Sequence, residues 1–313
     1  MKQKLAILFL SVTLAAMAAP PVPVIFDTDM GNDIDDALAL AMLHGMQSRG
    51  EIRLAAVTVT KDNLWAARFV SAVNIFYGRD KIPVGVVKNG VTKDEGNYNR
   101  KAIDGGRHKW SDQTQDAVAL LKDVLAKEAD GSVIVIQVGF STNLARLLAE
   151  PGGKALITRK VKLLSLMAGD FTNKGPEYNV HEDIAACTKL AAEWPTPAVW
   201  SGFEVGRTIK YPAKSIERDF AWAPKNPVVD GYKAYMKFPY DRETWDLTAV
   251  LYAVRPDSGY FDLSAPGNVL VDAKGFTKHI PAPGGLHRYL IVNDVQRARI
   301  LESMIWLVSQ PAR

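Results

Sequence analysis

The sequence is poor in cysteine, in excess charge and in repetitive segments. Its single cysteine, Cys187, cannot form a disulfide within the chain. It lies in the helix-like stretch DIAACTKLAAEW, where a buried and inert thiol is expected. The formal net charge is only +4, and Lys2 and Lys4 supply half of it, so no nucleic-acid-binding surface is predicted. Hydrophobic residues make up 48% and charged residues 23%, as is typical of a folded protein with a large core.

Residues 1–19 have the anatomy of a secretory signal peptide. A start with two lysines precedes a short apolar run, and small residues follow it in MKQKLAILFLSVTLAAMAAP. We expect cleavage near Ala18 or Ala19 and export to a periplasm or out of the cell. The apolar run is short for a membrane-spanning helix and no cysteine follows it for lipidation, so no stable membrane anchor is predicted.

Apolar runs alternate with amphipathic stretches up to residue 203. The predicted strands are residues 23–26, 52–59, 82–87, 132–138, 161–167 and 197–203. The predicted helices are residues 35–46, 64–77, 114–128, 142–150 and 181–194. Because the strands are continuous runs of Val, Ile and Leu without a period-two pattern, the expected fold class is α/β, with a mostly parallel central sheet flanked by helices.

The other segments are less regular. Residues 88–112 lack periodicity and predict a long loop, which in compact domains is often functional. Near the C-terminus we expect a helix at 245–253, a hairpin at 269–280 and a closing helix at 295–308. The chain after the signal peptide, residues 20–313, is interpreted as one α/β domain with this C-terminal elaboration.

The stretch VIFDTDMGNDIDDALAL crowds five aspartates behind an apolar strand. In an open parallel sheet, ligands bind beyond the carboxyl ends of the strands. Carboxylates held together there repel one another, so each must take up a proton or find a cation. All-oxygen ligands suit Ca²⁺ or Mg²⁺, and Ca²⁺ fits an exported protein better. A solvated acidic turn that starts a helix would explain Asp33 but not Asp27 and Asp29.

Several tracts together resemble one enzyme family. DTDMGNDIDDALAL, GFSTNLA, LMAGD, EYN and WDLTAVLYAV are similar, in this order, to landmarks of the inosine-uridine type nucleoside hydrolases, and they extend from Asp27 to Val254. The resemblance implies a Ca²⁺-dependent α/β enzyme that hydrolyses the N-glycosidic bond of ribonucleosides to free base and ribose.

The resemblance also implies roles for individual residues. Asp29 would be the general base and a metal ligand, and the calcium site would be completed by Asp36, the backbone carbonyl of Thr142 and Asp246. The residues implied to hold the ribose hydroxyls are Asp35, Asn173, Glu177 and Asn179. Asp27 matches a supporting carboxylate. Asp33 is also assigned a supporting role.

Two departures from the family pattern affect these assignments. The turn GNDIDD is two residues longer than the common G-x-D-D turn, which leaves the roles of Asp33 and Asp35 open. Trp245 stands where many members carry a histidine proposed to protonate the leaving base. A tryptophan there resembles the purine-specific branch, in which an indole stacks on the purine, and Asp62 could match that branch's base-contacting aspartate. A core aromatic at the start of a helix is the alternative for Trp245.

The long loop offers further candidates for base recognition. His108, with Trp110 nearby, is the histidine best placed in the sequence to reach a leaving group or to close over the base. The small-molecule partner expected is a nucleoside, and self-association into a homo-oligomer is left open.

Two other functions remain as alternatives. An exported nucleoside- or ribose-binding protein could keep the metal site without turnover. A haloacid-dehalogenase-like phosphatase would use Asp27 as a nucleophile with Mg²⁺, but that motif expects Thr or Val where Gly31 stands.

Overall fold

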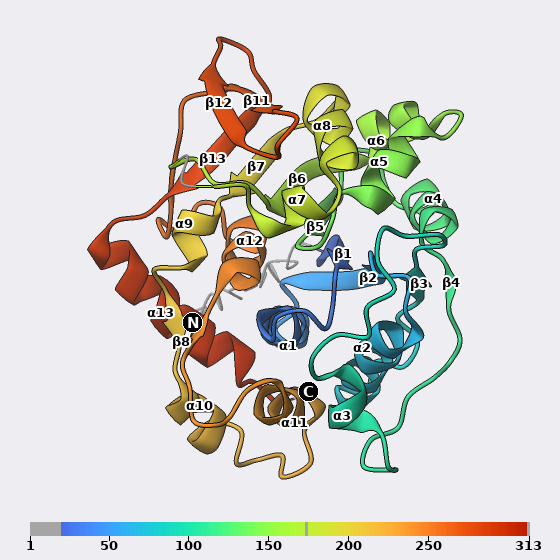
Figure 1. The fold of residues 1–313 in the computed structure, drawn as a ribbon, viewed down its shortest axis with the longest axis vertical. Coiled ribbons are helices and arrows are strands. Elements are labelled where there is room, and N and C mark those ends of the chain that lie inside the picture. The colour runs from blue at the N-terminus through green and yellow to red at the C-terminus, as the bar shows by residue number, and fades with distance from the viewer. Residues whose placement is uncertain (1–19, 173–174, 312–313) are drawn as a thin grey trace, which may run out of the picture.

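The computed structural model describes residues 20–172 and 175–311 (Figure 1). The predicted signal peptide, residues 1–19, and Asn173 lie outside the described residues. No helix of the described residues is both long enough and apolar enough to span a membrane.

The described chain forms an 11-stranded sheet with the order β12-β11-β13-β7-β6-β5-β1-β2-β3-β4, and β10 pairs with β13. A separate two-stranded sheet pairs β8 with β9. The strands are β1 (Val22–Thr28), β2 (Ile52–Val59), β3 (Val84–Val86), β4 (Gln115–Asp116), β5 (Val133–Gln137), β6 (Val161–Met167), β7 (Ala198–Ser201), β8 (Lys210–Tyr211), β9 (Arg242–Glu243), β10 (Asp262–Leu263), β11 (Gly267–Val271), β12 (Thr277–Pro281) and β13 (His287–Ile291).

The central strands are parallel, as the sequence predicts. All neighbours from β13 through β7, β6, β5, β1, β2 and β3 to β4 pair in parallel. The chain runs outward from β1 to β2 and β3 on one side, and from β5 to β6 and β7 on the other. The strand order therefore reverses between β1 and β5, and in such sheets ligands bind beyond the carboxyl ends of the strands at this switch point.

Helices cover both faces of the sheet (Figure 1). They are α1 (Asp35–Ser48), α2 (Leu64–Phe76), α3 (Asn99–Ile103), α4 (Ala117–Lys127), α5 (Thr142–Ala149), α6 (Gly153–Lys160), α7 (Tyr178–Glu182), α8 (Ile184–Glu193), α9 (Phe203–Gly206), α10 (Ala213–Arg218), α11 (Pro227–Tyr235), α12 (Trp245–Val254) and α13 (Asp294–Val308).

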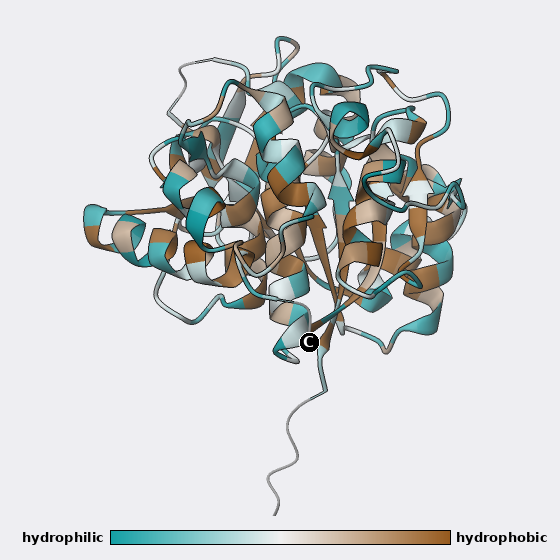
Figure 2. Cartoon of the chain, turned by 90° about the horizontal axis from the view of Figure 1, so that it is seen from below, coloured by the Kyte–Doolittle hydropathy of each residue, from teal (hydrophilic) through white to brown (hydrophobic). Residues whose placement is uncertain are grey.

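Successive residues of the central strands enter two different cores. Val24 and Phe26 of β1 pack in the core shared with α1, α2, α11, α12 and α13. Ile25 points to the opposite face and packs in the core shared with α4, α5, α6 and α8. Figure 2 shows the apolar strands running between helices on both sides. A strand buried on both faces needs apolar residues on both sides, which explains the apolar run from Val22 to Phe26 in β1.

The predicted elements up to residue 203 are present, with some differences in detail. The predicted helix at 181–194 is divided into α7 and α8, because the Asp183 side chain accepts a hydrogen bond from Ala186 N and starts a new helix. Residues 88–112, predicted as a loop, contain the short helix α3. Cys187 is fully buried in α8, and burial raises the pKa of its thiol to about 12.

The C-terminal elaboration is joined to the main sheet. The predicted hairpin is present as β11 and β12. The sequence pattern does not predict β13, which pairs in parallel with β7 and carries the hairpin onto the sheet edge. The closing helix is present as α13, which packs on α1.

Candidate active site

A cavity of about 690 Å³ opens where β1 and β5 end. The two chains approach closely there, because Gly139, which follows β5, lies against the backbone at the end of β1. A Cβ on Gly139 would lie 2.4 Å from the backbone nitrogen of Asp29. Only a glycine allows this approach, which brings the residues after β5 beside the acidic turn after β1.

Most of the predicted site residues meet in this cavity. Its lining includes the acidic turn after β1, the start of α1, the start of α7 and the start of α12. The predicted residues that line it are Asp29, Asp33, Asp35, Asp36, Glu177, Asn179, Trp245 and Asp246. The fold therefore joins three tracts that are far apart in the sequence.

Four of these side chains form a buried acidic cluster. Asp29, Asp35, Asp36 and Asp246 are each at most 5% exposed. Burial raises the pKa of Asp29 and of Asp35 to about 7. Burial raises the pKa of Asp36 and Asp246 well above the usual range, and the negative charges of neighbouring aspartates add to the effect. Without a counter-ion the cluster therefore favours protonated carboxyl groups.

Hydrogen bonds connect the acidic cluster across the helices that carry it. The Thr28 hydroxyl at the end of β1 donates to the Asp36 carboxylate. The Asp246 backbone N–H at the start of α12 donates to Asp35 Oδ2 at 3.0 Å. α1 and α12 pack side by side (Figure 1), so their acidic N-terminal turns lie at the same end of the cavity.

As placed, no group of three or more His, Cys, Asp or Glu side chains in residues 20–172 and 175–311 has the geometry of a metal site. The donor chemistry nevertheless fits a hard divalent cation. The cluster offers carboxylate oxygens alone, which suit Ca²⁺ or Mg²⁺ and not zinc. A cation would also offset the repulsion that raises the pKa values of these groups.

The structure separates the two aspartates that the longer turn left ambiguous. Asp33 has a side chain that is 42% exposed and forms an ion pair with Arg242 at 2.5 Å. It also accepts a hydrogen bond from the Tyr235 hydroxyl at 2.5 Å. Asp35 is 1% exposed and belongs to the acidic cluster. The position of Asp35 thus suits contact with a deeply bound ligand better.

The backbone fixes Glu177 and Asn179 at the start of α7. Glu177 caps the helix, with its carboxylate accepting from the N–H groups of Asn179 at 2.9 Å and Val180 at 3.2 Å. Burial raises the pKa of Glu177 to about 7. The Asn179 amide donates to the carbonyls of Val138 at 2.8 Å and Met167 at 3.1 Å. Both side chains are held rigidly at the cavity wall.

Asp27 and Thr142 lie behind the cavity lining. Asp27 is fully buried and accepts hydrogen bonds from Thr58 at 2.5 Å and Asn143 at 2.8 Å. Burial raises its pKa to about 7. The Thr142 hydroxyl donates to Asp183 at 2.6 Å, so its side chain is committed to the cap of α8. The predicted metal contact through the Thr142 carbonyl stays a prediction.

Three predicted base-binding residues are not among those that line the cavity. The Asp62 backbone N–H donates to Thr92 in the long loop. His108 forms a 2.7 Å contact with Asp230 of α11, and Trp110 packs against Trp65 of α2. These two contacts hold the segment around His108 along α2 and α11.

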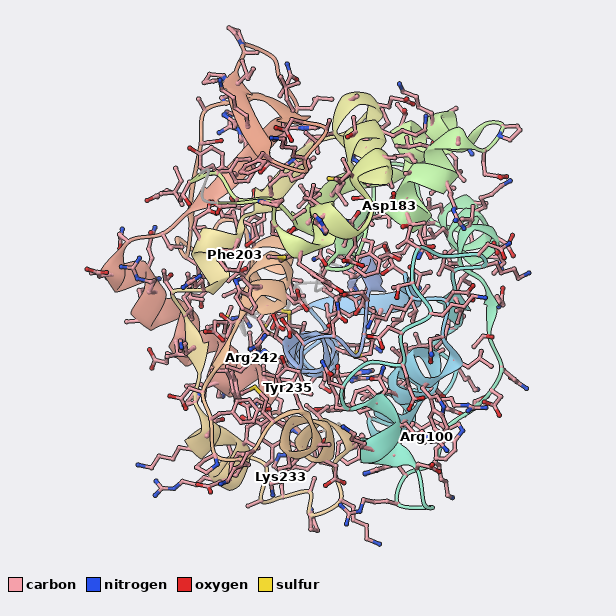
Figure 3. The ribbon with its side chains drawn as sticks, viewed as in Figure 1. Arg100, Asp183, Phe203, Lys233, Tyr235 and Arg242 are labelled. Atoms are coloured by element: carbon pink, nitrogen blue, oxygen red, sulfur yellow. The ribbon has the colours of Figure 1, made fainter. Side chains whose placement is uncertain are left out.

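Trp245 lines the cavity as part of an aromatic wall. Its indole stacks on Phe203 with ring centroids 5.4 Å apart, and the Arg242 guanidinium lies 5.0 Å from the indole centroid. Arg207 lies over Phe203 at 5.3 Å. Figure 3 labels Phe203 on α9, Arg242 on β9 and Tyr235 at the end of α11. Phe203 and Arg207 also line the cavity, so cations and aromatic rings together form this side of it.

The sequence pattern did not single out several residues at the site. Asn32, Tyr178, His181, Phe203 and Arg207 line the cavity. Lys61 lies behind it, fully buried, and its positive charge lowers the pKa of Asp29 against the effect of burial. The signal for Lys61 was its position directly after β2, beside Asp62. Among the described residues, His181 is the histidine that lines the cavity.

The fold and this cavity define an α/β protein with buried carboxylates around a cavity at the switch point of its parallel sheet. The chain belongs to the inosine-uridine preferring nucleoside hydrolase family, whose model matches residues 24–299. It is accordingly an enzyme that hydrolyses N-glycosyl bonds of nucleosides. No curated protein matches the chain by sequence.

Solved structures of low sequence identity share the fold. A purine-preferring ribonucleoside hydrolase from Gardnerella vaginalis is 20% identical with a TM-score of 0.74, over 92% of this chain and 98% of that one. An inosine-guanosine nucleoside hydrolase is 18% identical with a TM-score of 0.73, over 91% and 98%. An inosine-uridine preferring enzyme from Bacillus anthracis is 19% identical with a TM-score of 0.69, over 92% and 99%.

Proposed function

We propose that this protein is an exported, Ca²⁺-dependent nucleoside hydrolase that prefers purine ribonucleosides. The observation that carries the proposal is the buried acidic cluster, which lines the same cavity as Glu177, Asn179 and the aromatic wall. Export rests on the signal-like residues 1–19. The choice of Ca²⁺ rests on the all-carboxylate donor set and on the Ca²⁺ available outside the cytosol.

The residues divide into two groups along the cavity. Asp29, Asp36 and Asp246 would hold the cation, with the Thr142 carbonyl completing the protein's ligands. When bound, the cation would supply the charge that lowers the pKa of water. The Asp29 carboxylate would take the proton as water attacks the ribosyl carbon and the N-glycosidic bond to the base breaks. Asp35, Glu177 and Asn179, together with Asn173, would hold the ribose hydroxyls, and the carboxylates of Asp35 and Glu177 would stabilise the oxocarbenium-like centre through their charge.

The aromatic wall supports a preference for purines. Phe203 and Trp245 line the cavity together, and aromatic side chains stack on the larger purine rings with more contact area. Two structural neighbours are a purine-preferring ribonucleoside hydrolase and an inosine-guanosine nucleoside hydrolase. The base therefore lies against this wall, and the ribose lies at the buried carboxylates.

A substrate survey tests the proposed function. The mature chain is incubated with inosine, guanosine, adenosine, uridine and p-nitrophenyl phosphate, either with Ca²⁺ or with a chelator. We expect free base and reducing sugar only with Ca²⁺, and a higher kcat/KM for the purine nucleosides. Release of phosphate without release of base would favour the phosphatase alternative. Tight nucleoside binding without turnover would favour the binding protein.

Substitution of Trp245 tests the base preference. Trp245→Ala is expected to raise KM for inosine about tenfold, because stacking of a base on an aromatic side chain is worth about 1–3 kcal/mol. The loss for uridine should be smaller. Trp222→Ala is the matched control, because Trp222 is 40% exposed and its indole N–H donates to Ser309 near the C-terminus. Equal losses for inosine and uridine would argue against stacking.

A further inference from the structure

The turn after β1 carries an asparagine that links the acidic cluster to a buried lysine. Asn32 lies in the segment that makes this turn longer than the common family turn. Its amide Nδ2 donates to Asp29 Oδ2 at 2.8 Å. Its amide oxygen accepts from Lys61 Nζ at 2.6 Å. A continuous chain of hydrogen bonds thus connects Lys61 through Asn32 to Asp29.

The lysine determines which way the amide faces. A protonated lysine has three hydrogen-bond donors and no acceptor, so the Asn32 side chain must turn its oxygen toward Lys61. Its NH₂ group then faces the Asp29 carboxylate, which is the only orientation that satisfies both neighbours. Without Lys61, the amide oxygen would lose the donor that holds it on the side away from Asp29.

Both members of this pair are held firmly in place. Lys61 is fully buried directly after β2, and its Nζ also contacts Asp94 Oδ2 at 3.3 Å. The Asn97 side chain donates to the Asn32 carbonyl at 2.9 Å, and the Asn97 N–H donates to the Gly31 carbonyl at 2.7 Å. The residues around the long loop thereby fix the backbone of the acidic turn.

We propose that Lys61 and Asn32 form a positioning pair that orients the Asp29 carboxylate for its role as general base. The hydrogen bond from Asn32 to Oδ2 restrains the plane of the carboxylate and occupies one of its two oxygens. This inference rests on the proposed function of Asp29. Burying an ammonium group is unfavourable unless it is well paired, so a fully buried lysine at this place is consistent with a specific task in the site.

The variants Lys61→Met, Asn32→Ala and their combination test the pair in the mature protein. Each single variant is expected to lower kcat for inosine by about 10- to 100-fold, because a misplacement of about 1 Å can reduce a rate by that much. KM should change by less than about threefold, as expected when the effect lies in the chemical step. The double variant should lose no more kcat than the more impaired of the two single variants, because the two residues act through one hydrogen-bond chain.

Calcium titration supplies a measurement that does not depend on activity. Lys61→Met removes a positive charge beside the acidic cluster, so the Ca²⁺ concentration for half-maximal thermal stabilisation should fall or stay unchanged while kcat falls. Lys160→Met is the matched control for the loss of a buried lysine. Lys160 is 8% exposed, donates to the Glu128 carbonyl at 2.6 Å, and lies at the opposite end of the sheet before β6. The Lys160→Met variant is expected to lower the unfolding temperature without lowering kcat.

The outcomes separate this inference from the proposed function. A wild-type protein without Ca²⁺-dependent nucleoside hydrolysis would overturn the proposed function, and the positioning pair with it. An active wild type with Asn32→Ala and Lys61→Met near wild-type kcat would overturn the pair alone. Losses that multiply in the double variant, or a Ca²⁺ requirement that rises in step with the fall in kcat, would likewise contradict it. If Lys61→Met does not fold, Asn32→Ala decides, because Asn32 is a half-buried turn residue.

Discussion

Replacing Asp29 by asparagine is expected to lower kcat at least about 1,000-fold with inosine as substrate. General-base catalysis alone contributes about 10²- to 10⁴-fold, and the substitution also removes one carboxylate from the proposed metal site. Asparagine keeps the size of the side chain and resembles the protonated carboxyl group. Because burial raises the pKa of Asp29 to about 7, a neutral side chain at this position fits the metal-free protein well.

Stability measurements exclude misfolding as the cause of this loss of turnover. Asp29→Asn removes a buried charge from a cluster of like charges, so the metal-free variant should unfold at the same temperature as the wild type or at a higher one above pH 7. Asp123→Asn, at an exposed position of α4, is the matched control and should keep wild-type turnover. A kcat within tenfold of wild type for Asp29→Asn would show that another group is the base.

The fold could be predicted from the sequence to the extent that local patterns specify it. Apolar runs such as 133–136, within the predicted strand 132–138, identify a parallel sheet, because both faces of each strand are covered. β13 could not be recognised in this way. It lies near the sheet edge in the sequence HRYLI, where only His287 and Leu290 are buried, so it lacks the continuous apolar run on which the prediction depended.

The site was predictable where residues follow the ends of central strands. The positions of Asp29 and Glu177 at the rim follow from the strand-end rule, because both residues come after central strands. Asp246 lies in α12 and does not follow a central strand, so it was proposed only from the family resemblance. Residues whose placement depends on side-chain partners could not be predicted from the sequence. His108 is held by Asp230, and the choice between Asp62 and Lys61 after β2 depends on which side chain meets Asn32. No local pattern contains those long-range contacts.

The acidic cluster should make the stability of the metal-free protein depend on pH. Burial raises the pKa of Asp29, Asp35 and Glu177 to about 7, whereas these groups titrate near pH 4 in an unfolded chain. The folded state therefore binds more protons between these two values. The stability associated with these groups is fully present below about pH 4 and is lost as the pH rises through 7.

Calcium should oppose this dependence, because the cation binds deprotonated carboxylates. In chelator, the unfolding temperature is expected to fall from pH 5 to pH 8, and turnover should be lost at every pH. With Ca²⁺ at about 100 times its dissociation constant, the stabilisation should approach about 2.7 kcal/mol at pH 8 and fade toward pH 5. Thermal unfolding with and without Ca²⁺ across this range measures both effects.

The variant Asp246→Asn tests whether the acidic cluster causes both the pH dependence of stability and the stabilisation by Ca²⁺. The burial of Asp246, together with the charges of Asp35 and Asp36, raises its pKa well above the usual range, so the variant should flatten the pH dependence in chelator. It should also weaken the stabilisation by Ca²⁺, because one predicted ligand is lost. Asp257→Asn, exposed just beyond the end of the same helix, should keep both wild-type responses. A Ca²⁺ response of equal size at pH 5 and pH 8, or one that survives in Asp246→Asn, would place the metal elsewhere.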